Sequence, residues 1–174
     1  MHKFRFLSKT YGEVFRIFQM DSFDIKILNI VQQNNRLPTE KIAERVGLSP
    51  SAVQRRLKRL RDEKTIEADA AVVSPEAVGK KLLAIVEVKL RKEIPVASGL
   101  EGFKRSMLEA PEVIQCFHVT GATDFILVVA AKDMPDYEDF TRRYFIENRN
   151  VSGFQTSVVI SRVKSGPVIP LEEE

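Results

Sequence analysis

The chain has 174 residues, of which 44% are hydrophobic and 29% charged, so it can bury a core and is not a disordered chain. Its formal net charge of +3 permits an anionic partner but does not by itself indicate one. A single cysteine, Cys116, and only two histidines exclude an internal disulfide, make a metal site unexpected and are typical of a reducing compartment. No apolar run approaches the roughly 20 residues of a membrane span, so we expect a cytoplasmic protein without a membrane segment.

The first recognisable pattern along the chain is a run of three short helices. A first helix begins near Asp21, whose carboxylate can accept hydrogen bonds from the free amides of the first turn. Pro38 suits the start of a second helix, which ends at Gly47 because glycine readily adopts the left-handed conformation of a tight turn. Ser49 and Pro50 then provide the N-cap and first residue of a third helix.

The third helix is apolar on one side and cationic on the other. Its apolar side chains recur at helical spacing and form a buried stripe of Val53, Leu57 and Leu60. No acid stands between Ser49 and Arg61, a stretch that holds the cluster Arg55, Arg56, Lys58, Arg59 and Arg61. A short helix, a glycine turn and a helix with a basic front are what a recognition helix needs to enter a DNA major groove. We therefore predict DNA binding; the alternative is a basic helix face that is merely solvated.

Roles can be assigned within this predicted DNA interface. Its residues are Thr39, Ser49, Ser51, Gln54, Arg55, Lys58, Arg59 and Arg61. The start of a recognition helix enters the groove most deeply, so Ser51, Gln54 and Arg55 are assigned to base edges and the later cations to phosphates. Thr39 is assigned to a phosphate, with an ordinary N-cap role as the alternative. Arg56 leans toward the buried stripe and is expected to pair with an acid.

The pattern changes after the three helices. We expect a short strand or wing at 65–73 and a linker at 74–80. Beyond them, strands are predicted at 82–90, 113–120, 125–131 and 153–163, and helices around 100–107 and 133–145. This order is that of a ferredoxin-like βαββαβ fold, in which two helices cover one face of an antiparallel sheet. The other face carries apolar residues and is expected to pack against another copy of the chain.

The predicted fold class is therefore α+β, with two domains and two terminal segments. A helix-turn-helix domain of winged-helix-like type is placed at 20–73 and the ferredoxin-like domain at 81–164. Residues 165–174 end in three glutamates and are interpreted as a solvated acidic tail. Residues 1–19 are interpreted as an upstream extension, either a flexible arm or not part of the native chain. The alternative is an added amphipathic helix built on Phe4, Leu7, Tyr11, Val14 and Phe18.

These motifs resemble one family. The helix-turn-helix of the Lrp/AsnC (feast/famine) transcription regulators is similar to IAERVGLSPS at 42–51 followed by VQRRLKRL at 53–60. The run GATDF at 121–125 resembles the glycine-to-aspartate loop of that family's ligand domain. The resemblance covers about residues 20–165. It implies a homodimer formed through the ferredoxin-like domains, assembly into tetramers or octamers, and a small effector, usually an amino acid, bound near that loop.

The predicted effector site is the loop made of Thr120, Gly121, Ala122, Thr123 and Asp124. Gly121 lets the backbone approach a ligand closely, and Asp124 can pair with an α-ammonium group. The alternative interpretation is a plain hairpin turn, because glycine and aspartate are both favoured turn residues. The family loop often carries an acid directly after the glycine, where Ala122 stands here.

The resulting prediction is a sequence-specific transcription regulator that binds double-stranded DNA and whose activity or oligomeric state responds to an amino-acid effector. The alternative is an architectural DNA-binding protein with little sequence preference and no effector. An RNA-binding module would need exposed aromatic side chains on its central strands, which the pattern does not provide. His118 with Asp124 is the only local acid–base pairing, so we predict neither a catalytic site nor a cofactor.

Overall fold

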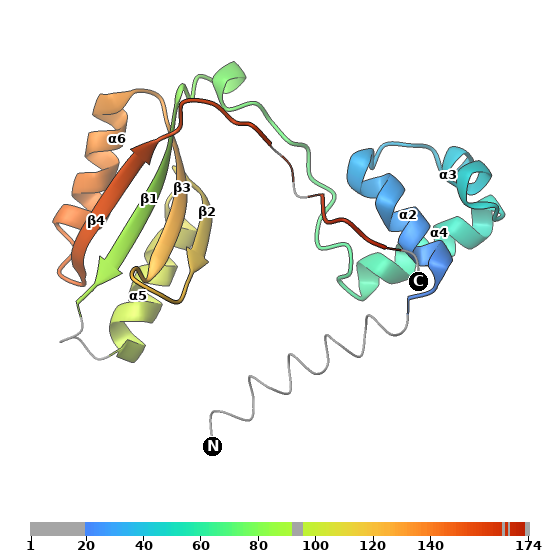
Figure 1. The fold of residues 1–174 in the computed structure, drawn as a ribbon, viewed down its shortest axis with the longest axis horizontal. Coiled ribbons are helices and arrows are strands. Elements are labelled where there is room, and N and C mark those ends of the chain that lie inside the picture. The colour runs from blue at the N-terminus through green and yellow to red at the C-terminus, as the bar shows by residue number, and fades with distance from the viewer. Residues whose placement is uncertain (1–19, 92–95, 165, 167, 173–174) are drawn as a thin grey trace. The chain divides into compact units, whose positions relative to one another are not determined.

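The computed structural model describes residues 20–91, 96–164, 166 and 168–172, so the amphipathic helix considered for residues 1–19 lies outside the described residues. The chain forms two compact units (Figure 1). The described residues up to Ala71 join those after Lys164 in the first unit, and Val72–Lys164 form the second. Each unit has its own hydrophobic core.

The first unit contains the three predicted helices, α2 (Ser22–Gln33), α3 (Thr39–Val46) and α4 (Pro50–Asp62). Their apolar faces meet in one core, which consists of Ile27, Leu28, Ile42, Ala43, Val46, Val53, Leu57 and Leu60. Each predicted boundary has a local cause. Asp21 caps α2, Gly47 ends α3 with a φ of 73°, and the Ser49 hydroxyl accepts the Ala52 amide at the start of α4.

The wing expected at 65–73 is wrong, because the structure has no strand there. The segment instead returns to the three helices: the Ile66 amide donates to the Leu60 carbonyl, and the Ile66 side chain packs against their core. A strand needs a neighbouring strand to receive its backbone hydrogen bonds, and all four strands in the described part of the chain belong to the second unit.

The end of the chain packs against α2. The Gln32 carboxamide accepts the Ile169 amide at 2.7 Å and donates to the Ile169 carbonyl at 3.1 Å. The Asn29 amide donates to the Leu171 carbonyl, and the Leu171 side chain packs against the core of the first unit. The expected solvated tail rested on the three terminal glutamates. The apolar run VIPL at 168–171 precedes them, and its residues Ile169 and Leu171 make the contacts with α2.

The second unit is a four-stranded antiparallel sheet with strand order β2-β3-β1-β4. Its strands are β1 (Leu82–Leu90), β2 (Val113–His118), β3 (Phe125–Ala131) and β4 (Val151–Val158). The helices are α5 (Val96–Glu109) and α6 (Met134–Thr141), with a π-helical turn η2 (Arg142–Ile146) after α6 and a short 3₁₀ helix η1 (Glu76–Val78) before β1. The order of these elements confirms the predicted βαββαβ fold.

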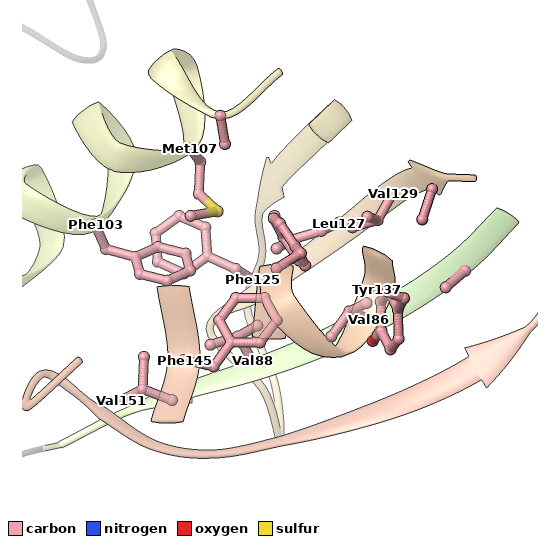
Figure 2. Close-up of a cluster of buried hydrophobic side chains, with 14 residues drawn as sticks. Val86, Val88, Phe103, Met107, Phe125, Leu127, Val129, Tyr137, Phe145 and Val151 are labelled. Atoms are coloured by element: carbon pink, nitrogen blue, oxygen red, sulfur yellow. The ribbon is translucent and has the colours of Figure 1, made fainter. Parts of the chain in front are cut away.

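The helices pack on one face of the sheet. Figure 2 shows Phe103 and Met107 of α5 lying over the same buried cluster that Phe125 of β3 and Tyr137 of α6 enter. The rings of Phe103 and Phe125 lie 4.7 Å apart between centroids, and Phe145 of η2 continues the aromatic layer. The buried alternation of β1 matches the expectation that its even-numbered residues face the core.

Strand pairing explains where two predicted strands end early. The first residues of β1 pair with the last of β4, so the ladder closes where the Val159 amide donates to the Leu83 carbonyl. The last strand therefore spans 151–158 rather than 153–163. Similarly, β2 stops at His118 because its partner there, Phe125, is the first residue of β3.

Candidate DNA interface and effector loop

Helix α4 is held in the first unit by its apolar stripe, which leaves its opposite side exposed. Val53, Leu57 and Leu60 are buried against α2 and α3. Its exposed residues include Ser51, Gln54, Arg55 and Lys58, which are four of those assigned to DNA from the sequence. Ser49 and Ser51 share a hydroxyl–hydroxyl hydrogen bond of 3.1 Å at the start of the helix.

Most of the cations on α4 have carboxylate partners from elsewhere in the unit. Arg56 binds Asp21 and Asp24 of the α2 N-terminus, which confirms the expected acid partner of Arg56. Arg59 also binds Asp24, whose side chain is only 1% exposed. The guanidinium of Arg59, which the sequence assigned to phosphate, is thus held by a buried carboxylate in this structure.

The two remaining pairs are more exposed. Arg61 donates from Nε and Nη2 to both carboxylate oxygens of Asp69, a bidentate geometry that likewise engages a side chain assigned to phosphate. This hydrogen bond lowers the pKa of Asp69. Lys58 contacts Asp62 one turn along the same helix, with side-chain exposures of 78% and 62%. Such exposed pairs contribute little free energy, so Lys58 can leave its partner for another anion.

Arg55 differs from the other four cations of the cluster. Within the described ranges, 20–91, 96–164, 166 and 168–172, it has no carboxylate partner. Its neighbour Gln54 is also exposed and bonds to no other described side chain. Arginine can fork onto guanine and glutamine onto adenine, so the side chains left available are those suited to base edges.

Thr39 and Arg36 lie outside α4, at the start of α3 and in the turn before it. Thr39 is the first residue of α3 and is half-buried, while the N-cap is Pro38, so the alternative role of Thr39 as N-cap is wrong. Arg36, which the sequence did not assign to DNA, stands in the turn between α2 and α3. It is exposed and lines a hollow of about 280 Å³ with Asn35 and the Arg61–Asp69 pair.

The predicted effector loop joins β2 to β3 and is tied to β1. The Thr123 hydroxyl donates to the Val88 carbonyl at 2.8 Å, and the Asp124 carboxylate accepts the Leu90 amide at 2.8 Å. The Asp124 amide also donates to the Val88 carbonyl. Through these bonds Thr123 and Asp124 stabilise the turn, as the alternative interpretation of the loop as a plain hairpin turn expects.

The other three residues of the loop remain open to solvent. Thr120, Gly121 and Ala122 are exposed, and Gly121 has a φ of 122°, a conformation that other residues rarely adopt. The loop therefore combines a fixed base with an exposed tip. Backbone amides at such a tip can receive a carboxylate.

The remaining chemistry of the described residues concerns metal binding, the Cys116 thiol and membrane insertion. Among the described residues, no group of three or more histidine, cysteine or acidic side chains could hold a metal ion. Partial burial of the thiol raises the pKa of Cys116, which favours its protonated form, although the residue as a whole is exposed. Nor does any helix within the described ranges have both the length and the apolar character to cross a membrane.

Comparison with known proteins covers both units. Residues 20–61 match the AsnC-type helix-turn-helix domain, and residues 83–169 match the Lrp/AsnC ligand binding domain. The chain belongs to the Lrp/AsnC family. It is thus a DNA-binding transcription regulator, as the sequence resemblance implied, and the family is one of regulators rather than enzymes.

Individual members of the Lrp/AsnC family resemble the chain over most of its length. It is 51% identical over 154 residues to an uncharacterized HTH-type transcriptional regulator, y4tD, of Sinorhizobium fredii, covering 88% of this chain and 90% of that protein. It is 35% identical over 145 residues to a proline dehydrogenase transcriptional activator of Rhizobium radiobacter, covering 83% and 92%. The crystal structure of the Neisseria meningitidis regulator NMB0573 in complex with L-Met is 37% identical, covers 87% and 97%, and superposes with a TM-score of 0.81.

Proposed function

We propose that this Lrp/AsnC regulator reads a specific DNA sequence through the exposed side of α4. The observation that supports this is the sorting of its cations by ion pairs. Arg56, Arg59 and Arg61 are engaged by carboxylates, whereas the side chains of Arg55 and Gln54 have no partner among the residues that the structure describes. A protein that only coats DNA would be expected to present its cations to phosphates, and such contacts carry no sequence information.

Dimerisation would present two copies of α4 to a pseudo-palindromic site, with half-sites about one helical turn apart or a multiple of it. The surface proposed for it is the sheet face that α5 and α6 leave uncovered. This face is apolar at its centre, with Ile85, Phe117, Ile126 and Val128, and polar at Glu87 and Lys89. Its side chains are too apolar and exposed for a face that meets only water.

The proposed effector is an amino acid bound at the exposed tip of the loop 120–124. The related regulator from Neisseria meningitidis was crystallised with L-Met, which supports an amino acid as the ligand class. Backbone amides around Gly121 would receive the α-carboxylate, while Asp124 keeps the loop in place. The effector would shift activity by its different affinity for two assembly states.

The DNA proposal is tested by the substitution Arg55→Ala. We expect it to weaken binding to the cognate promoter fragment by about 1–3 kcal/mol and to relax the base preference at one position. Binding to random DNA at the same salt concentration should change little. Arg105→Ala, an exposed arginine of α5 in the second unit, is the matched control. Equal affinity of the parent protein for promoter and random DNA would favour the architectural alternative.

The effector proposal is tested by thermal unfolding in the presence of each common amino acid. A ligand at one hundred times its dissociation constant stabilises the folded protein by about 2.7 kcal/mol, which raises the melting temperature measurably. Thr120→Ala, at the exposed tip of the loop, should reduce the increase in melting temperature produced by any amino acid that stabilises the parent. A full panel without a shift would remove the amino-acid effector from the mechanism.

A further inference from the structure

Asp24 is a carboxylate that the first unit buries completely. It lies in the first turn of α2, where the Asp21 amide donates to its Oδ2 and its own amide donates to the Asp21 side chain. That capping box alone would not require burial, since capping carboxylates are ordinarily solvated. Burying a charge is unfavourable unless it is paired, so the partners of Asp24 determine what it does.

These partners are two arginines of α4. Arg56 Nη1 donates to Asp24 Oδ1 at 2.9 Å, and Arg59 Nη2 donates to Oδ2. Arg56 also contacts Asp21 and lies over the Phe23 ring, so its guanidinium is enclosed on several sides. The Nε of Arg59 is buried without a hydrogen-bond partner among the described atoms. Arg59 therefore binds Asp24 through Nη2 while its Nε–H stays without a hydrogen-bond acceptor among the described atoms.

We propose that Asp24 is a positioning residue for DNA recognition, which keeps Arg56 and Arg59 on the protein and away from the phosphates. This inference rests on the proposed function of α4. Arg59 is 42% exposed on its side chain, so it lies close enough to solvent to reach a phosphate once it is released. By holding both guanidiniums, Asp24 limits affinity for any DNA and leaves discrimination to Arg55 and Gln54.

Lys58 differs from Arg59 in how firmly its partner holds it. Among the described residues Lys58 pairs only with Asp62, an exposed carboxylate on its own helix, so it is available to a phosphate. Each phosphate contact releases a counterion and steepens the dependence of log K on log salt concentration by about 0.9. The salt dependence of binding to random DNA therefore counts the cations that reach the backbone.

The direct test is Asp24→Asn, which keeps the size and hydrogen-bonding oxygen of the side chain but removes its charge. We expect a salt dependence steeper by about one phosphate contact, because Arg59 is released. Random DNA should bind several-fold more tightly at low salt, and the ratio of specific to random affinity should fall. A folded variant with unchanged slope and unchanged ratio would show that Asp24 only supports the fold and would overturn the proposal.

If Asp24→Asn does not fold, a second pair of variants tests whether Arg59 is kept away from the phosphates. Arg59→Gln should leave the slope of the parent unchanged, whereas Lys58→Gln should reduce it by about 0.9. An equal reduction in both variants would place Arg59 on a phosphate and overturn the role given to Asp24. If Lys58→Gln and Arg55→Ala both bind as the parent does, the proposed DNA interface itself is wrong, which is a different result.

Discussion

Single ion pairs in the first unit differ in how much they constrain their cations. Lys58–Asp62 is exposed on both sides, Arg61–Asp69 is intermediate, and Arg59–Asp24 has one fully buried partner. Because water screens a pair in proportion to its exposure, the constraint rises in that order. Mutating a cation of α4 should therefore affect DNA binding or folding according to the depth of its partner.

The Arg61–Asp69 pair makes stability depend on pH. The hydrogen bond from Arg61 lowers the pKa of Asp69 in the folded state, so the unfolded state binds more protons. The pair is thus fully stabilising above the ordinary aspartate pKa, and its contribution is lost as pH falls below about 4. Hydrogen exchange of α4 amides should show Asp69→Asn to be less stable than the parent at pH 7, by less than about 1 kcal/mol.

The same measurement at pH 3 provides the control. At pH 3, which lies below the ordinary aspartate pKa, Asp69 of the unfolded parent takes up a proton, so the difference between parent and Asp69→Asn should shrink. Arg61→Gln should behave as Asp69→Asn does at both pH values, because it removes the other half of the pair. A difference that grows on acidification would contradict the assignment.

Among the elements, the C-terminal segment has the least expected position. Its residues Ile169 and Leu171 follow the second unit in sequence but complete the first. Leu171 shields part of the three-helix core, and Gln32 and Asn29 supply hydrogen bonds that a free tail would make with water. The segment therefore acts as an added layer on α2.

Removing residues 167–174 should lower the stability of the first unit without affecting the second. Exposing the Leu171 contact surface costs about 1 kcal/mol or more, since a fully buried leucine contributes about 1.5–3. Hydrogen exchange of α2 and α4 should become faster in the truncated chain, while β1 and β3 should be unchanged. Leu171→Ala should reproduce most of the effect, and Glu172→Ala, an exposed neighbour, should not.

The features that were predictable from sequence are those with local causes. The caps at Asp21, Gly47 and Ser49, and the alternation of β1, depend on residues within a few positions of one another. The wing and the overlong last strand were wrong because strand limits depend on a partner strand, and a single run of sequence does not show where that partner ends.

The candidate site was predictable in its location but not in its detail. The stretch from Ser49 to Arg61 holds no acid, so its arginines seemed free. Their partners come from other elements, Asp24 from α2 and Asp69 from the segment after α4. The same holds for Asp124, whose carboxylate is used by a backbone amide of β1. Contacts of this kind form only when the chain folds, so spacing could not reveal them.

For the whole molecule, assembly is proposed to depend on the uncovered sheet face. Ile85→Asp and Val128→Asp place a carboxylate at its apolar centre, where a second copy would bury the charge without a partner. Sedimentation should show these variants as monomers at concentrations where the parent is a dimer. Gln155→Asp, on β4 at the rim of the same face, is the matched control and should leave the dimer intact. A parent that is itself monomeric would contradict the proposal.

Because Leu171 belongs to the first unit, the order of synthesis bears on when this regulator can work. The ribosome releases helices α2 to α4 well before Leu171, whose side chain packs against their core from beyond the second unit in sequence. A chain that stops before Leu171 would carry a complete second unit and a first unit without this contact.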